Sequence, residues 1–187
     1  NKSNYFVHKN NNLIISTVGR FSREKNQLFL VKAFNNISNK NLKLVLFGPK
    51  GNIYNEILDY IEQNNLQEHI NIKVGEDNPH NIYKDIDIFV LPSLYEGFPN
   101  SLYEAMIYCK ICLISDKANI DQHIIDKYNG YVFKLDSIND LIRKINYIVE
   151  NIDSKEVYLI RENAYNYVKD NYSIEKIVLE YNQLYEI

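Results

Sequence analysis

Residues 13–47, LIISTVGRFSREKNQLFLVKAFNNISNKNLKLVLF, contain the pattern that decides the fold. They begin with the apolar run Leu13–Val18 and end with the apolar run Leu42–Phe47, and a glycine follows each run. Short apolar runs that end at turn residues are typical of buried strands. The segment between them has helical spacing, with apolar residues at Leu28, Val31, Ala33 and Phe34. The whole stretch therefore predicts a strand, a helix and a second strand.

The same alternation continues through the rest of the chain. Further strands are predicted at 70–74, 86–91, 111–115 and 130–133. Helices are predicted at 53–61, 79–84 and 101–108, with a brief helical stretch between 116 and 129. From Ser137 onward the pattern is helical, with breaks near Asp153 and Asn171. Strands and helices in alternation predict an α/β fold, a Rossmann-like three-layer domain with a mainly parallel sheet that ends in C-terminal helices.

Length and composition indicate one globular domain. The 187 residues predict a single domain over 1–187, with 1–12 as a linker or an edge segment and 137–187 as the C-terminal helices. Hydrophobic residues make up 45% of the chain and charged residues 24%, as in ordinary globular proteins. The chain starts at Asn1 with a polar stretch that resembles no signal peptide, so we expect a piece excised from a longer protein.

Charge and cysteine content exclude several classes of function. A formal net charge of −3 argues against a nucleic-acid partner. No apolar run reaches the roughly 18 residues that a transmembrane helix needs. The two cysteines, Cys109 and Cys112, form a C-x-x-C at the end of a predicted helix, where the helix dipole does not activate a thiol. We therefore expect structural cysteines and a reducing, cytoplasmic location.

In an open parallel sheet, ligands bind beyond the carboxyl ends of the strands. The first loop at that edge is 19–26, in which Arg20 and Lys25 lie five residues apart before a helix. Arginine offers a planar fork and lysine a point charge, and both suit phosphate oxygens. The alternative is a solvated loop with ordinary surface charges.

The second loop, 92–101, leads into a helix that starts near Ser101. Amides at a helix start attract anions, and Gly97 allows a ligand to approach the backbone closely. Glu96 and Glu104 are placed to accept hydrogen bonds from the paired hydroxyls of a sugar. The alternative is that Ser101 and Glu104 form a capping box, in which Glu104 only bonds an amide of its own helix. The third loop, Ser115 to Asn119, is polar, and Asp116 there fits a helix cap equally well.

Together these loops resemble the C-terminal domain of the GT-B retaining glycosyltransferases of family 4, the glycosyl transferases group 1. Gly19-Arg20 with Lys25 matches the G-R-x-x-x-x-K segment of the family, and Glu96 to Glu104, after Leu91-Pro92-Ser93, matches its E-x7-E motif. Ser115-Asp116 and Asn129-Gly130 follow in the family's order. The resemblance is dense over 13–135 and loose over the C-terminal helices.

The resemblance implies a role for each matching position. Arg20 and Lys25 would bind the donor diphosphate and stabilise the leaving nucleoside diphosphate, without a metal or another cofactor. Glu104 would hold the ribose hydroxyls, Glu96 would contact the donor sugar near its reacting carbon, and the loop from Gly75 to Asn78 would lie against the base. Donor contacts are further implied, through amides or side chains, at Gly19, Gly97, Phe98, Asn100, Ser101 and Leu102. Glu96, Arg20 and Lys25 would form the catalytic group.

The resemblance also implies partners. The family places an acceptor-binding domain first, so we expect that N-terminal domain to be absent from this chain and the fragment alone to transfer no sugar. The full enzyme would use a nucleotide-sugar donor in the synthesis of a bacterial surface polysaccharide (capsule or lipopolysaccharide) or a glycolipid, with peripheral association at the inner face of the cytoplasmic membrane. The final helix, 173–187, would cross toward the missing domain, although packing on its own sheet is the simpler expectation.

Some positions depart from the family pattern. Ala118 and Asn119 stand where the family often has two glycines, and Gln122 where it often has a glutamate. Cys109 and Ile111 replace a common glycine and proline. Two alternatives stay open: a nucleotide-sugar epimerase or phosphorylase-like enzyme with the same architecture, and a non-catalytic nucleotide-binding module.

Overall fold

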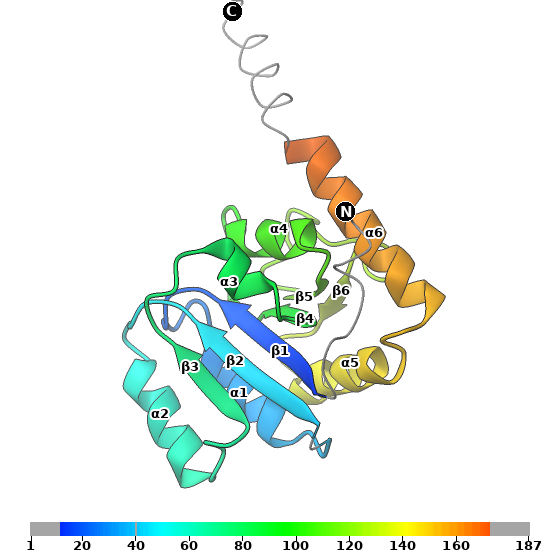
Figure 1. Cartoon of the computed structure of the whole chain (residues 1–187). Coiled ribbons are helices and arrows are strands. Elements are labelled where there is room, and N and C mark those ends of the chain that lie inside the picture. Colours follow the sequence, from blue (N-terminus) through cyan, green and yellow to red (C-terminus); the bar gives the residue numbers. More distant parts are fainter. Residues whose placement is uncertain (1–11, 40, 173–187) are drawn as a thin grey trace, which may run out of the picture.

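A computed structural model describes residues 12–39 and 41–172, in which one parallel sheet lies between two layers of helices (Figure 1). The strands are β1 (Leu13–Val18), β2 (Leu42–Phe47), β3 (Ile70–Lys73), β4 (Ile88–Leu91), β5 (Ile111–Ser115) and β6 (Tyr131–Phe133). The helices are α1 (Gln27–Asn35), α2 (Tyr54–Gln63), α3 (Pro79–Tyr83), α4 (Asn100–Ile107), α5 (Ile138–Glu150) and α6 (Lys155–Tyr172).

The strand order is β3-β2-β1-β4-β5-β6, and every neighbouring pair is parallel. Ile15, in the middle of β1, is in register with Leu44 of β2 on one side and with Ile88 of β4 on the other. This is the order of the doubly wound Rossmann sheet, in which the direction of winding reverses between β1 and β4. The predicted fold class is therefore confirmed.

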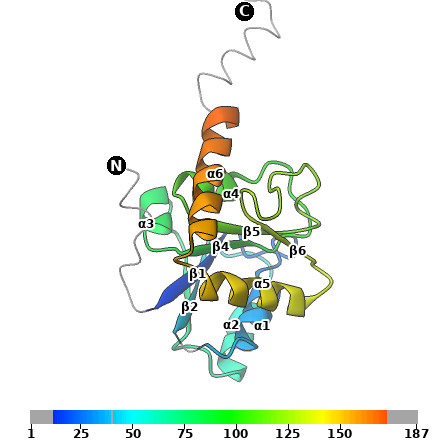
Figure 2. The same ribbon diagram turned by 90° about the vertical axis from the view of Figure 1, so that its right-hand side faces the viewer.

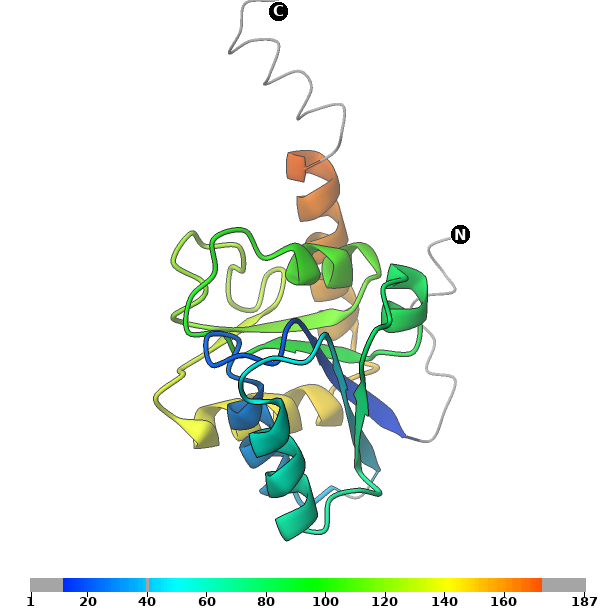
Figure 3. The ribbon, with the colours of Figure 1, turned by 90° about the vertical axis from the view of Figure 1, so that its left-hand side faces the viewer.

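The helices divide between the two faces of the sheet, as Figures 1, 2 and 3 show from three sides. Helices α1, α2 and α5 pack on one face, and α3 and α4 pack on the other. Helix α6 joins both layers, because Val157 and Ile160 pack with the first layer and Ala164 and Val168 with the second. Among residues 12–39 and 41–172, no helix combines the length and the apolar character that crossing a membrane needs.

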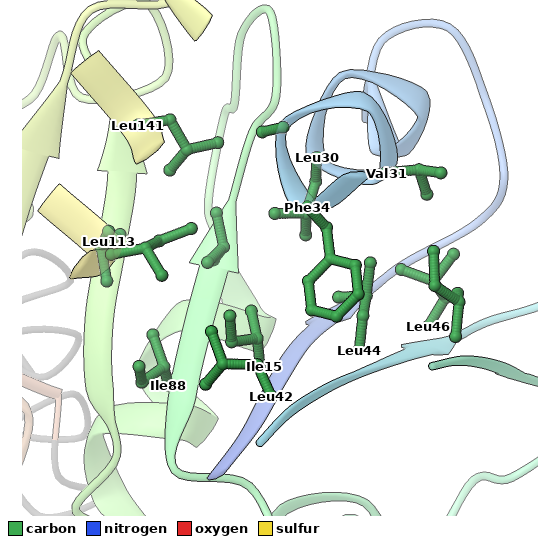
Figure 4. Close-up of a cluster of buried hydrophobic side chains, with 14 of the residues drawn as sticks. Ile15, Leu30, Val31, Phe34, Leu42, Leu44, Leu46, Ile88, Leu113 and Leu141 are labelled. Atoms are coloured by element: carbon green, nitrogen blue, oxygen red, sulfur yellow. The ribbon is translucent and has the colours of Figure 1, made fainter. Parts of the chain in front are cut away.

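Helix α1 packs on the centre of the sheet through Leu30, Val31 and Phe34, which point toward β1 and β2 (Figure 4). Ile15 lies beneath them with no exposed surface. Close packing of this kind fixes the strands, and the strands in turn fix where the loops at their carboxyl ends begin.

The predicted helical stretch between 116 and 129 is wrong. The structure has turns there, held by two asparagine side chains. The amide of Asn119 bonds both the N–H and the carbonyl oxygen of Ile124, at 2.9 and 2.8 Å. Asn129, which is fully buried, accepts from Ile125 N and donates to His123 O. Asparagine side chains compete in this way with the backbone bonds of a helix.

The other expected element limits need small changes. Strand β3 ends at Lys73 and β4 begins at Ile88, each inside its predicted range. The break near Asp153 is confirmed, since α5 ends before it and α6 starts after it. Helix α6 runs through Asn171 to Tyr172, so there is no break at Asn171 itself, and the residues just after it fall outside the described part of the chain. The expectations for 1–11 and for the final helix at 173–187 fall outside the described residues.

Candidate functional site

The β1 loop (residues 19–26) and the β4 loop (residues 92–99) leave neighbouring strands at the point where the sheet reverses its winding. Leu94 N donates to Glu24 O at 2.8 Å, and Asn26 Nδ2 donates to Pro92 O at 3.2 Å. The two loops therefore form one continuous surface at the switch point, where open α/β sheets bind ligands.

Lys25 and Glu96 form an ion pair across these two loops. Lys25 Nζ lies 2.8 Å from both Glu96 Oε1 and Glu96 Oε2. Ser93 Oγ donates to Glu96 Oε1 at 2.5 Å. The Glu96 side chain is 6% exposed, whereas 33% of the Lys25 side chain is accessible to solvent. A second ligand for the ammonium can therefore approach from the open side.

Arg20 is exposed in the same loop as Lys25, and hydrogen bonds hold its backbone in place. Gln27 is buried, and its Nε2 donates to the carbonyl oxygens of Gly19 and Arg20, at 3.2 and 2.8 Å. The backbone of Arg20 is thus fixed at the switch point, while its side chain is accessible to solvent.

Two glycines of the loop after β2 allow it to touch the β1 loop. A Cβ on Gly48 would lie 2.0 Å from Gly19 O, and a Cβ on Gly51 would lie 2.2 Å from Phe21 O. Phe21 N also donates to Pro49 O at 3.1 Å. No side chain fits in either place, so these glycines are required for the position of the Arg20 segment.

Helix α4 starts after Pro99, with no side-chain cap. The capping-box alternative is therefore wrong, because Ser101 lies inside the helix rather than at its cap. Glu104 instead accepts a hydrogen bond from the Tyr83 hydroxyl, which lies 2.9 Å from Glu104 Oε2. Its carboxylate is partly exposed and can meet a ligand on its other oxygen.

The remaining predicted donor positions lie at the same edge. Gly97, Phe98 and Asn100 are exposed, and Ser101 is half-buried. Leu102 is fully buried, and its N–H bonds Pro99 O within the first turn of the helix. Gly75 follows β3 with a φ of 82°, and a Cβ on this residue would have nothing within 4 Å. Direct donor contacts at these residues stay a prediction.

The third loop has a structural role rather than a cap. Ser115 Oγ donates to Ser93 O at 2.5 Å and so supports the residue that bonds Glu96. Asp116 caps no helix, because its Oδ1 accepts from Leu135 N at 3.0 Å beyond β6.

Both cysteines are buried, and burial raises the pKa of the Cys112 thiol above its ordinary value. Cys109 has a φ of 55°, the left-handed conformation that favours glycine just after the end of a helix. In the part of the chain that the structure describes, no three His, Cys, Asp or Glu side chains are grouped as metal ligands.

Sequence reasoning missed three residues of this site: Tyr83, Gln27 and Ser93. A role for Gln27 and Ser93 could have been predicted from the sequence, because each is a polar residue beside an apolar strand or helix and lies close to a motif residue. Tyr83 carried none, because its partner Glu104 lies 21 positions away on another helix.

Comparison with known proteins shows the family to which the chain belongs. The family described as "Glycosyl transferases group 1" matches residues 2–167. The chain belongs to the group 1 glycosyl transferases. It is 29% identical over 182 residues to the Escherichia coli UDP-Gal:alpha-D-GlcNAc-diphosphoundecaprenol alpha-1,3-galactosyltransferase, covering 95% of this chain and 46% of that protein.

Solved structures share the fold of this group 1 domain. The Anabaena protein Alr3699/HepE, solved in complex with UDP and glucose, is 18% identical, with a TM-score of 0.86 over 94% of this chain and 48% of that one. The C-terminal domain of the group 1 protein LpcC from Francisella tularensis is 21% identical, with a TM-score of 0.77 over 93% of this chain and 98% of that domain. The chain thus spans about half the length of the curated relatives it matches and nearly all of a solved C-terminal domain.

Proposed function

We propose that this chain is the donor-binding domain of a retaining glycosyltransferase, which transfers a sugar from a nucleotide diphosphate-sugar to an acceptor. The observation that carries the proposal is the Lys25–Glu96 pair at the switch point of the sheet, with Arg20 exposed in the same loop as Lys25. A cation pair next to a nearly buried carboxylate suits a ligand that has a diphosphate at one end and hydroxyls at the other.

Arg20 and Lys25 supply the charge that the leaving group needs. As the bond between the sugar and the diphosphate breaks, negative charge grows on the phosphate oxygens, and cations fixed in place stabilise it. Lys25 is accessible on one side, so a phosphate oxygen can share its ammonium with Glu96. Gln27 fixes the backbone at Arg20, so the exposed side chain extends from a fixed point at the carboxyl edge of the sheet.

In this proposal, Glu96 binds the donor sugar and Glu104 binds the ribose of the nucleotide. Ser93 and Lys25 orient the Glu96 carboxylate from two sides, which leaves it nearly buried and rigid. Glu104 lies about one turn along α4 from the β4 loop, with Tyr83 on one oxygen. The loop at Gly75, which leads into α3 and Tyr83, would then meet the base.

The acceptor and its domain belong to the same proposal. The E. coli relative is named for an acceptor linked to diphosphoundecaprenol, a lipid carrier. By analogy, the whole protein would carry an N-terminal acceptor domain and act in bacterial surface polysaccharide or glycolipid synthesis. It would work in the cytoplasm, with peripheral contact to the inner face of the membrane. Arg20 and Lys25 would replace a metal ion at the diphosphate.

A thermal-shift titration of the chain with UDP, GDP, ADP and CDP tests the proposal. A ligand at a hundred times its Kd stabilises by about 2.7 kcal/mol, which raises Tm by several degrees for a domain of this size. We expect one nucleotide to raise Tm in the wild type and far less in Lys25→Met or Glu104→Ala. Lys169→Met removes an exposed lysine of α6 and should leave the shift unchanged. No shift with any nucleotide would contradict the proposal.

A further inference from the structure

Tyr83 is a fully buried tyrosine that lies at the end of α3, between the base loop and α4. Its ring stacks on Tyr108 with the centroids 5.4 Å apart and meets Phe89 at 6.2 Å with a tilt of 56°. These ring contacts and complete burial restrict the orientation of the ring. The buried ring contacts therefore determine the direction in which the Tyr83 hydroxyl points.

The hydroxyl of Tyr83 reaches two groups of α4. It donates to Glu104 Oε2 at 2.9 Å, and it also lies 3.1 Å from Ser101 O as a second acceptor. Ser101 is in the first turn of α4 and Glu104 is in the next. The hydroxyl has a single proton to donate, and both acceptors within its reach lie on α4, with Glu104 Oε2 the nearer.

The chemistry of this contact suits positioning. Burial, together with the charge of Glu104, raises the pKa of Tyr83 well above its ordinary value, so the hydroxyl keeps its proton and stays a donor. Glu104 Oε1 makes no hydrogen bond among the described residues, which leaves that oxygen for a ligand. A glutamate without this contact would sample several rotamers.

We propose that Tyr83 is a positioning residue for ribose recognition, whose hydroxyl orients the Glu104 carboxylate toward the hydroxyls of a bound nucleotide. The inference rests on the proposed function, which assigns the ribose to Glu104. It goes further in naming the group that holds Glu104 in place. Since Tyr83 ends the helix that follows the Gly75 loop, it also connects the base contact to the ribose contact.

The test compares ribose and deoxyribose ligands on Tyr83→Phe. The substitution keeps the ring and its stacking and removes only the hydroxyl. Affinities are measured by calorimetry for whichever of UDP, GDP, ADP and CDP binds most tightly, and for its 2′-deoxy and 3′-deoxy forms. We expect Tyr83→Phe to weaken binding of the ribonucleotide about fivefold, as for coupled neighbours in one hydrogen-bond network, and to affect at least one deoxy form much less. In a Glu104→Ala background, Tyr83→Phe should then have no further effect.

Tyr131→Phe is the matched control, because Tyr131 is also buried and its hydroxyl has no hydrogen-bond partner among the described residues. It should leave ribose discrimination unchanged. Equal losses for ribose and both deoxy forms in Tyr83→Phe, or no loss at all, would overturn the positioning role while the proposed function stands. A wild-type chain that binds none of the four nucleotides would overturn the proposed function and this inference with it.

Discussion

Lys25 Nζ lies 2.8 Å from each carboxylate oxygen of Glu96, although the two residues are 71 positions apart in the sequence. The pair closes the gap between the β1 and β4 loops, at the place where the winding of the sheet reverses. The two side chains therefore link the β1 and β4 loops, and they also place a cation and a carboxylate at the candidate site.

Lys25→Met separates these two roles. It leaves the Glu96 carboxylate nearly buried without its cation, so the free energy of unfolding should fall by about 1–2 kcal/mol, less than for a fully buried pair because Lys25 is partly exposed. The double variant Lys25→Met/Glu96→Gln removes the stranded charge and should recover most of this stability. Urea unfolding measures the free energy of unfolding of the single and the double variant. Nucleotide binding should remain lost in the double variant, and its recovery would show that Lys25 acts only through stability.

Gly48→Ala should destabilise the domain by about 2 kcal/mol, in the range for overpacked sites, because its Cβ would fall 2.0 Å from Gly19 O. Gly97→Ala is the matched control, since nothing lies within 4 Å of a Cβ there, and it should change unfolding free energy little. Thermal unfolding of the two variants provides the comparison. Equal stabilities would mean that the two loops do not touch as described.

Lys110 should make stability depend on pH. It is buried near Asp87 and Arg161, and burial lowers its pKa to about 8 in the folded chain. The unfolded chain therefore binds more protons at Lys110 between about pH 8 and 10, so stability rises with pH there, by at most about 1.4 kcal/mol per unit. Lys110→Met should lack this rise. Urea unfolding at pH 8 and 9.5 compares the two chains, and parallel curves would contradict the assignment.

Removal of metal ions should not weaken nucleotide binding, because Arg20 and Lys25 are proposed to supply the charge at the diphosphate. The thermal shift produced by the best nucleotide should be equal with EDTA and with added Mg²⁺. A shift that requires Mg²⁺ would assign the diphosphate to a metal and not to the two cations.

The sequence was sufficient for the sheet and for the edge at which the charged loops meet. Apolar runs such as Leu13–Val18 bury themselves wherever they occur, and parallel strands bring the loops after them to one edge. That is why Arg20, Lys25 and Glu96 could be placed together in advance. The family resemblance then supplied roles that the residues alone left open.

Contacts that depend on tertiary geometry could not be predicted in the same way. The spacing of Ser101 and Glu104 fits a capping box, but Pro99 is the residue at the cap of α4, and the buried Tyr83 takes the carboxylate instead. The sequence after Asp116 predicts a short helical stretch, but the side chains of Asn119 and Asn129 form hydrogen bonds to the backbone there and hold it in turns. In both cases a side-chain hydrogen bond takes the place of the contact that the local sequence pattern predicts.

A crystal structure of the chain with its best nucleotide diphosphate tests the central claim most directly. The account predicts the diphosphate within hydrogen-bond distance of Arg20 and Lys25, and the ribose against Glu104. A diphosphate bound elsewhere, or bound at this edge without either cation, would contradict it.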